Sequence, residues 1–282
     1  MILLRLKGGL GNQLFQLVAA LYLGQILHRK VYIDKSCLSR YRQERTFDAA
    51  KLINCSDSAF FRGYAFQERF LELISCLRPS RLFTFLNLGD EDLQLLPDSC
   101  ALKFKQSLPL LFIDSYMLSG WSKSLFHKAL SQVPWLQFED ATPLLAVAAN
   151  EVAIHVRGGD FLKLPSHNIC SYDHYCNCVN LAMLSGYRSF VIVSDETSYG
   201  ASFLYMLKRD FPQSEFRLRE SSSDPLIDFF FLKNSDGLIA GNSTFAFWAN
   251  ALSSSVIASW SSSFFSISLN KPFRFNRETW VD

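Results

Sequence analysis

The sequence predicts an α/β protein with two Rossmann-like halves that face each other, each a parallel sheet covered by helices. Short apolar strands alternate with helical segments along most of the chain. Both halves also begin with a strand that ends in a basic residue and two glycines, Lys7-Gly8-Gly9 and Arg157-Gly158-Gly159. Residues 224–252 add the order helix, strand, polar turn, helix, which is typical of a doubly wound sheet. We therefore expect one domain over residues 1–149 and another over residues 150–282.

The composition is that of a globular chain with ample material for two cores. Of 282 residues, 49% are hydrophobic and 19% are charged, which excludes intrinsic disorder. A net charge of +2 without a basic run argues against nucleic acid as a partner. Seven cysteines without a framework spacing suit a reducing cytosol. Met1 leads directly into a strand and no apolar run could span a membrane, so we expect a cytoplasmic chain with at most peripheral membrane contact.

The first half opens with a strand over residues 2–6, followed by the glycine turn Lys7-Gly8-Gly9-Leu10-Gly11-Asn12. From Gln13 to about His28 the apolar residues fall at helical spacing, and residues 31–33 predict the next strand. A glycine turn that opens a helix lets backbone N–H groups approach a ligand, although the spacing is not the dinucleotide fingerprint. The turn is therefore either a ligand contact or an ordinary strand-to-helix turn.

The rest of the first half has a weaker pattern. Residues 66–77 favour a helix within the poorly patterned stretch 36–110. Residues 111–114 predict a strand, residues 120–133 an amphipathic helix and residues 134–143 a linker.

The second half has a regular alternation of elements. Strands are expected at 152–157, 190–194, 216–218, 238–240 and 256–260, and helices at 172–184 and 199–209. Asp224 and Pro225 are the cap and first residue of a further helix, which is apolar enough to be buried. The turn from Gly241 to Thr244 then caps a last helix over residues 245–252. Such a turn binds anions in doubly wound sheets, but an αβα segment without a ligand has the same pattern.

Polar residues follow the strand at 152–157. A buried guanidinium at this strand end needs an anion, which for Arg157 is either a ligand or the carboxylate of Asp160 or Asp195. His155 lies on the same face of the strand and is either a core histidine or a ligand contact. Asp160 is compatible with pairing to Arg157 and with catalysis.

A cluster of possible metal ligands follows, but its spacing matches no zinc pattern and we predict no metal site. Its members are His167, Cys170, His174, Cys176 and Cys178. The chain has no phosphate loop of the GxxxxGK[ST] kind, and no Ser–His–acid arrangement can be argued from spacing.

Three stretches together resemble the α-1,2-fucosyltransferases, glycosyltransferase family 11. GGLGNQLFQ at residues 8–16 is similar to the amino-terminal signature of that family, and HVRGGDF at 155–161 is similar to its HxRRGDY motif. The stretch DFFFLKNSDGLIAGNSTFAFWANAL at 228–252 resembles its block ending in IIANSTFSWWAAxL, and VSDE at 193–196 resembles a weaker strand-end motif. The order and spacing agree across most of the chain, and residues 36–110 carry little resemblance.

The resemblance implies a two-lobed GT-B fold, with an acceptor-side domain first and a nucleotide-sugar domain second. It implies an inverting transfer of L-fucose from GDP-L-fucose to the 2-hydroxyl of a terminal galactose, without a metal or cofactor. Arg157 and Asp160 are its catalytic candidates, with Asp160 as general base, and Asp228 is expected to read guanine. The donor contacts it implies are Gly9, Gly11, Asn12, His155, Arg157, Asp195, Asp228, Asn242, Ser243, Thr244 and Phe245.

One position departs from the family pattern, because Gly158 replaces the second arginine of the nucleotide-sugar motif. The alternatives are therefore a related transferase with another nucleotide sugar and a catalytically silent nucleotide- or sugar-binding homologue. The retained Arg157, Asp160, Asn242 and Ser243 favour the enzyme. Such an enzyme would suit bacterial surface polysaccharide synthesis, on a galactose-terminated and lipid-linked acceptor at the inner face of the cytoplasmic membrane.

Overall fold

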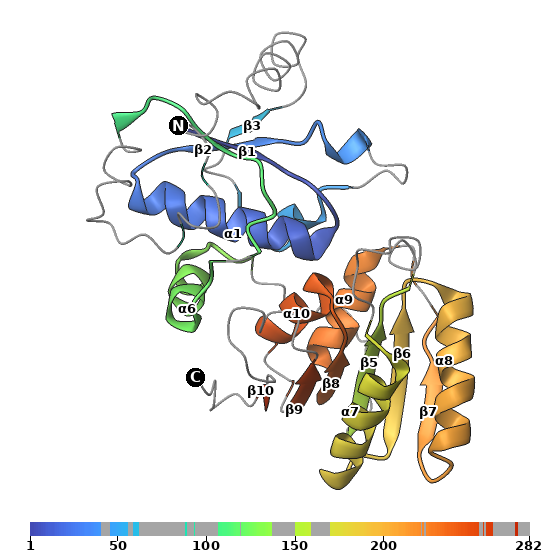
Figure 1. The fold of residues 1–282 in the computed structure, drawn as a ribbon. Coiled ribbons are helices and arrows are strands. Elements are labelled where there is room, and N and C mark those ends of the chain that lie inside the picture. Colours follow the sequence, from blue (N-terminus) through green and yellow to red (C-terminus); the bar gives the residue numbers. More distant parts are fainter. Residues whose placement is uncertain are drawn as a thin grey trace. The chain divides into compact units, whose positions relative to one another are not determined.

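The chain divides into two compact units, Met1–Glu139 and Asp140–Asp282, which Figure 1 shows as a ribbon. The computed structural model describes residues 1–40, 46–55, 59–61, 88, 93, 107–118, 120–136, 150–158, 170–220, 222, 224–253, 256, 258–261 and 274–275. The predicted domain boundary between residues 149 and 150 adjoins a stretch outside these ranges, so it stays a prediction. The helix predicted at 66–77 also lies outside the described residues.

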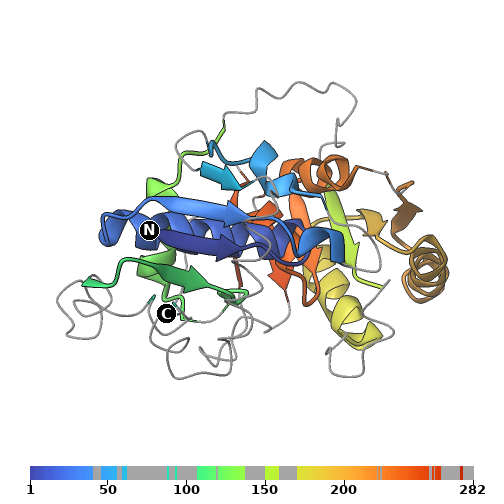
Figure 2. The same ribbon diagram turned by 90° about the horizontal axis from the view of Figure 1, so that it is seen from above.

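The first unit contains a four-stranded sheet in the order β3-β2-β1-β4, and every neighbouring pair is parallel. Its strands are β1 (Ile2–Arg5), β2 (Val31–Asp34), β3 (Ala59–Phe61) and β4 (Leu111–Ile113). Its described helices are α1 (Leu10–Ile26) and α6 (Lys123–Gln132), with two short 3₁₀ helices, η1 (Leu38–Arg40) and η2 (Asp48–Lys51). Figure 2 shows α1 lying along the strands of this sheet.

The order in which the chain adds strands to this sheet changes sides at β1. From β1 the chain moves outward to β2 and β3, and it later returns to the opposite side of β1 as β4. Parallel strands of this kind are buried on both faces, and Ile2, Leu4 and Ile33 are fully buried here. The carboxyl ends of β1, β2 and β4 therefore meet at one edge, the place where open α/β sheets bind ligands.

The end of the first unit differs from the sequence prediction. The helix expected at 120–133 begins only at Lys123, because the hydroxyl of Ser122 caps it by accepting the Leu125 N–H at 3.2 Å. The predicted linker begins later than residue 134, since Trp135 forms a bridge with Ile53. Residues 134–136 are thus part of the first unit, and 137–143 lie outside the described residues.

The second unit has a six-stranded sheet in the order β10-β9-β8-β5-β6-β7, parallel except for β10. Its strands are β5 (Glu151–Val156), β6 (Ser189–Ser194), β7 (Glu215–Leu218), β8 (Gly237–Ala240), β9 (Ala258–Ser261) and β10 (Arg274–Phe275). Its helices are α7 (Tyr172–Leu184), α8 (Thr197–Asp210), α9 (Pro225–Asn234) and α10 (Thr244–Ala251). The last parallel strand, predicted at 256–260, begins two residues later and ends one residue later, and β10 was not predicted.

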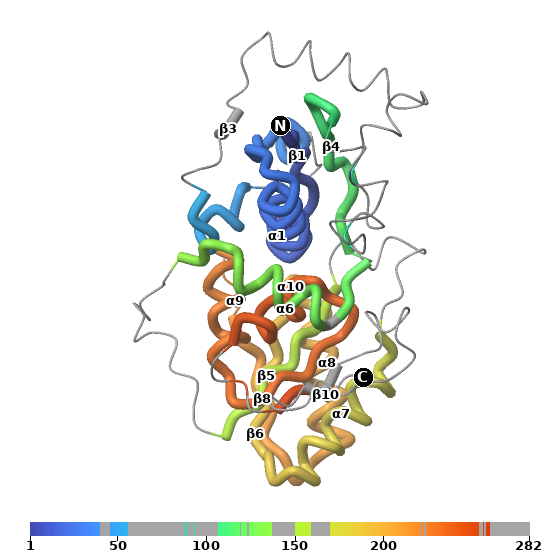
Figure 3. The backbone as a smooth tube through the Cα atoms, turned by 90° about the vertical axis from the view of Figure 1, so that its left-hand side faces the viewer, coloured from blue at the N-terminus to red at the C-terminus, as the bar shows by residue number. Residues whose placement is uncertain are grey.

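The order of the strands distributes the helices over two faces. The chain moves from β5 to β6 and β7 in one direction, and from β8 to β9 in the other. Since such crossovers are right-handed, α7 and α8 cover one face and α9 and α10 the opposite one; in Figure 3, α7 and α9 lie on either side of β5 and β8. The topological switch point is therefore between β5 and β8.

The face under α7 and α8 is the main core of the second unit. Phe190, Phe203 and Leu207 are buried there together with the alternate β5 side chains Val152, Ile154 and Val156. The opposite helices pack on each other through aromatic rings, with Phe229 of α9 edge-on to Phe245 of α10 at 5.4 Å between ring centroids. No helix in the described part of the chain combines the length and the apolar character that crossing a membrane requires.

Candidate functional site

The carboxyl edge of the second sheet gathers most of the side chains that the sequence marked as candidates. His155 is the penultimate residue of β5, and its register partner in β8 is Ala240. Arg157 follows the end of β5, and Asp195 follows the end of β6. The turn after β8 leads directly into α10. These elements meet at the switch point because all of their strands run in the same direction.

Arg157 is held by an ion pair with Asp195. The Arg157 Nη1 atom lies 2.7 Å from Asp195 Oδ2, and the Gly158 N–H donates to Asp195 Oδ1 at 2.9 Å. One carboxylate thus fixes both the guanidinium and the backbone that follows it. The expectation that Arg157 is buried is wrong, since its side chain is 24% exposed. Asp160, the other anticipated partner and the predicted general base, lies outside the described residues.

Tyr199 explains why glycine is found at position 158. A Cβ atom built on Gly158 would lie 2.7 Å from Tyr199 Cδ1 and 3.2 Å from Glu196 Cβ. Both neighbours stand at the start of α8, so the space beside the turn is filled by an aromatic ring. An arginine at position 158 would require Tyr199 to move.

His155 links β5 to the first turn of α10. Its side chain is buried, and its ring stacks on Phe245 with a centroid distance of 5.7 Å and an interplanar angle of 28°. The Nδ1 atom is buried without a hydrogen-bond partner in the described structure. Burial, and then the charge of Arg157, lowers the pKa of His155 to about 3. The imidazole is therefore neutral at physiological pH and presents a polar atom at the switch point.

The low pKa of His155 predicts a specific acid sensitivity. Between its ordinary pKa of 6.5 and about 3, the unfolded chain binds a proton that the folded chain does not. Stability should therefore fall as the pH drops below 6.5, with a slope approaching about 1.4 kcal/mol per pH unit for one proton. Urea unfolding from pH 6.5 to 4.5 should show this slope in the wild type and a shallower one in His155→Gln.

The exposed His127 supplies the matched control for this experiment, since His127→Gln removes a histidine of the same chain from its surface. The slope of His155→Gln should be shallower than that of this surface variant. An equal slope in His155→Gln would mean that His155 titrates in the folded protein as it does in the unfolded chain.

The turn after β8 is shaped by close packing. A Cβ atom at Gly241 would overlap the Tyr175 hydroxyl, which itself donates to the His155 carbonyl at 3.3 Å. Ser243 is buried, and its hydroxyl caps α10 by accepting the Ala246 N–H at 3.4 Å. Asn242 and Thr244 flank this cap. The result is a helix amino terminus, with its partial positive charge, beside the buried ring of His155.

Asp228 lies in the first turn of α9 and has a cationic partner that sequence analysis missed. Its Oδ1 atom is 3.2 Å from Nε of Arg219, and the two side chains are 14% and 19% exposed. Burial raises the pKa of Asp228, while the hydrogen bond and charge of Arg219 and a hydrogen bond with the Ser222 backbone lower it. Arg219 directly follows β7, so its position at a strand end was a signal available in the sequence.

The glycine turn of the first unit is built differently from the prediction. The helix α1 begins at Leu10, so Gly9 is its N-cap and Gly11 and Asn12 lie in its first turn. The sharp change of direction falls at Gly8, where φ is +75°, a conformation that glycine adopts without strain. Of the residues predicted to form the turn, Gly9, Gly11 and Asn12 thus belong to the start of α1.

Two buried glutamines fix this helix start to the turn that precedes it. Gln16 accepts the Lys7 N–H at 3.0 Å and donates to the Lys7 carbonyl at 2.8 Å. Gln13 donates to the Gly8 carbonyl at 3.0 Å and accepts the Ala49 N–H at 3.2 Å. Their role in the signature is therefore structural, because they satisfy backbone groups that the turn would leave buried and unpaired.

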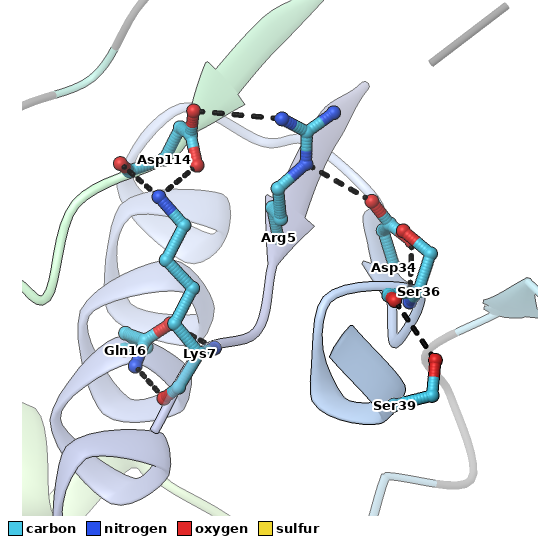
Figure 4. A network of polar contacts seen from close by, with 7 residues as sticks. All are labelled: Arg5, Lys7, Gln16, Asp34, Ser36, Ser39 and Asp114. Atoms are coloured by element: carbon cyan, nitrogen blue, oxygen red, sulfur yellow. Dashed lines mark hydrogen bonds and ion pairs between the residues drawn. The ribbon is translucent and has the colours of Figure 1, made fainter. Parts of the chain in front are cut away.

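The carboxyl edge of the first sheet carries a charged cluster, defined here as Arg5, Lys7, Asp34 and Asp114 (Figure 4). Arg5 Nε is 3.2 Å from Asp34 Oδ2, and its Nη1 is 3.6 Å from Asp114 Oδ2. The ammonium group of Lys7 forms an ion pair with Asp114 and donates to the Asp114 carbonyl at 3.0 Å. The cluster ties the ends of β1, β2 and β4 to the turn that precedes α1.

The cysteines and histidines of α7 make packing contacts. The Cys178 thiol is buried 3.7 Å from His174 Nε2, which is 3.2 Å from the Ala240 carbonyl. Cys176 is half-buried on another side of the helix, and His167 lies outside the described residues. Among the described residues no group of three or more His, Cys, Asp or Glu side chains is arranged to hold a metal ion.

Neither the family models nor the curated proteins that we compared with this chain include a match. Solved structures do match. The fucosyltransferase NodZ from Bradyrhizobium is 14% identical with a TM-score of 0.57, over 98% of both chains. A mutant of Arabidopsis thaliana FUT1 in complex with GDP is 14% identical with a TM-score of 0.55, over 92% of this chain and 70% of the other. POFUT1 in complex with GDP-fucose is 12% identical with a TM-score of 0.51, over 92% and 96%.

These similarities establish the fold class. The chain has an α/β architecture with one parallel and one mainly parallel sheet, and it shares the GT-B fold with the matched structures. The predicted GT-B fold is confirmed. At such low identity the comparison defines the architecture and leaves substrate and linkage to the chemistry of the site.

Proposed function

We propose that this chain is an inverting glycosyltransferase that moves L-fucose from GDP-L-fucose to the 2-hydroxyl of a terminal galactose. The observation that carries the proposal is the arrangement at the switch point of the second sheet. An oriented arginine, a buried neutral histidine and a capped helix amino terminus stand at the same edge. The matched structures with GDP-fucose, NodZ and POFUT1, support the choice of donor.

The chemistry requires stabilisation of a leaving diphosphate. The acceptor oxygen forms a bond to the anomeric carbon as the bond from that carbon to the diphosphate breaks, through an oxocarbenium-like transition state. Negative charge then grows on the β-phosphate of GDP. Arg157 and the backbone N–H groups at the start of α10 would stabilise this charge, which is how such a site can work without a divalent cation.

A base must take the proton of the acceptor hydroxyl. We assign this role to Asp160, three residues beyond Arg157 in the sequence. A guanidinium close to this carboxylate would lower its pKa and weaken it as a base. Asp160→Asn separates two roles: a base loses turnover and keeps GDP affinity, whereas a residue that only orients Arg157 loses both.

The 2-linkage and the acceptor rest on the motif resemblance, since one of the matched structures is that of NodZ as an α-1,6-fucosyltransferase, soaked with GDP-fucose. The acceptor would approach the start of α1, near Gly9, Gly11 and Asn12. A cytoplasmic enzyme of bacterial surface polysaccharide synthesis, acting at the membrane face on a lipid-linked glycan, is the setting that we propose.

The activity is tested by GDP release from GDP-L-fucose with methyl β-galactoside as acceptor. Its 2-deoxy analogue should give no transfer, whereas its 6-deoxy analogue should react normally. Both results should persist in EDTA. Transfer to the 2-deoxy but not to the 6-deoxy compound would exclude the 2-linkage, and loss of activity in EDTA would exclude the metal-independent mechanism.

Two further outcomes correspond to the alternatives. Release of GDP or UDP from a different nucleotide sugar, without release from GDP-L-fucose, would indicate a related transferase. Binding of GDP without turnover on any donor and galactoside would indicate a silent homologue, for which the replacement of the second arginine by Gly158 is the supporting observation.

Asp228 is assigned to the guanine base. Guanine presents two adjacent N–H donors that one carboxylate can accept together, and adenine and uracil do not. Bidentate pairing of this type contributes ~1–3 kcal/mol of base discrimination. Calorimetry should therefore show a preference for GDP over ADP in the wild type and a smaller preference in Asp228→Asn.

The competing role for Asp228 is local, since its carboxylate also bonds to the backbone of Ser222. If that contact were its whole purpose, Asp228→Asn would lower thermal stability and leave the GDP-to-ADP affinity ratio unchanged. Asp224→Ala is a matched control, because Asp224 caps the same helix through the Leu226 N–H at 2.9 Å and alanine removes that cap. It should lose stability and keep the ratio.

A further inference from the structure

The Arg219–Asp228 contact joins two elements of the second unit at the carboxyl edge of its sheet. Arg219 follows β7, and its N–H donates to the Ile192 carbonyl of β6 at 2.9 Å, which holds its backbone to the sheet. Its guanidinium carbon is 4.4 Å from the centroid of Phe231. Phe231 and Asp228 are three residues apart on α9, so one face of that helix presents both to Arg219.

This arrangement immobilises the guanidinium more firmly than an ordinary surface pair. A cation over an aromatic face gains electrostatic attraction, and the buried Phe231 ring excludes water from one side of it. The carboxylate is only 14% exposed and the guanidinium 19%. Arg219 therefore approaches Asp228 from a fixed direction and donates from Nε to Oδ1 at 3.2 Å.

The Asp228 carboxylate has enough acceptor positions for its protein partners and for a ligand. An ionised carboxylate offers about four lone-pair positions. Within the described part of the chain, Arg219 and the Ser222 backbone use two of them. Two positions are what the paired N–H donors of guanine require, and they are available only while Asp228 is ionised.

We infer that Arg219 is the positioning residue for nucleotide selectivity, which keeps the Asp228 carboxylate ionised and turned toward the base of the bound nucleoside diphosphate. This rests on the proposed function, in which Asp228 reads guanine. Arg219 itself does not contact the base. It acts through Asp228, so its removal changes which nucleotide is bound more than how tightly the phosphates are held.

The charges around Asp228 give the inference a pH signature. Asp224 raises the pKa of Asp228 and Arg219 lowers it, while burial raises it. Without Arg219 the carboxylate should take up a proton at a higher pH than in the wild type. A protonated Asp228 cannot accept both guanine donors, so the preference for GDP should disappear on acidification earlier in a variant that lacks the cation.

The test measures calorimetric affinities for GDP and ADP at pH 8 and pH 6 in the wild type and in Arg219→Gln and Arg219→Lys. In Arg219→Gln the GDP-to-ADP ratio should fall about tenfold at pH 6 and less at pH 8. Arg219→Lys retains the charge and should keep the pH dependence of the wild type, with a smaller ratio because the planar fork is lost. It also serves if the Gln variant does not fold.

Arg217→Gln is the matched control, because Arg217 belongs to β7 and pairs with Glu151 at 2.6 Å, away from Asp228. It should lose stability and retain the GDP-to-ADP ratio. If the wild type prefers GDP and Arg219→Gln has the same GDP-to-ADP ratio at both pH values, the role of Arg219 is overturned and the assignment of Asp228 to guanine stands. A wild type that does not prefer GDP would overturn the base assignment and the inference with it.

Discussion

Replacing Arg157 with alanine is expected to lower turnover with GDP-L-fucose by ~10²–10³-fold, a loss of ~2.7–4 kcal/mol in the barrier. The guanidinium is held 2.7 Å from Asp195, so it is oriented before the donor binds and does not reorganise during the reaction. Its contact with the leaving diphosphate strengthens as charge develops there. Turnover should therefore fall further than GDP affinity, as measured by GDP release and by calorimetry.

Two variants make this result specific. Arg157→Lys should recover activity in part, because an ammonium group supplies charge without the planar geometry of the guanidinium. Arg209→Ala removes an exposed arginine whose partner is the adjacent Asp210, and it should behave as the wild type. Near-normal turnover in Arg157→Ala would leave Arg157 as a structural partner of Asp195, the alternative that the sequence kept open.

The strand ends were predictable because apolar runs set the strands and polar residues follow them. His155, Arg157 and Asp195 stand at the carboxyl edge that the pattern indicated. The ion pair between Arg157 and Asp195 was not predictable, since it depends on which strand neighbours β5. The order of strands places β6 there, and with it Asp195.

The start of α1 shows where local pattern and packing differ. Glycines at positions 8, 9 and 11 suggested an extended turn, yet the helix begins at Leu10. The buried side chains of Gln13 and Gln16 satisfy the backbone of the turn from within the helix. Glutamine in an apolar helical run is a signal for this arrangement, because a buried amide requires partners.

Contacts between elements far apart in sequence account for the remaining differences. The Tyr199 ring beside Gly158 and the Arg219 guanidinium beside Asp228 come from segments that no local pattern connects to those positions. The first concerns the glycine that replaces the second arginine of the motif, and the second concerns the residue assigned to guanine. Asp160 lies outside the described residues, and its role stays a prediction.

The charged cluster of the first unit predicts the largest effect on stability. Asp114→Asn is expected to lower the free energy of unfolding by about 3 kcal/mol, near the lower end of the range for breaking a buried ion pair. Asp114 is 6% exposed and faces two cations, Arg5 at 13% and Lys7 at 17% exposure. Arg5 keeps Asp34 as a partner, so the variant leaves mainly Lys7 without its carboxylate.

Urea unfolding followed by circular dichroism measures this loss, and high salt should change it little because buried pairs are screened weakly. Lys30→Gln removes an exposed charge from the same unit and should leave the transition unchanged. In the double variant Asp114→Asn with Lys7→Gln, most of the loss should be recovered, since the uncompensated cation is gone. A loss below about 1 kcal/mol in Asp114→Asn would instead place the cluster with exposed surface pairs, which contribute little to stability.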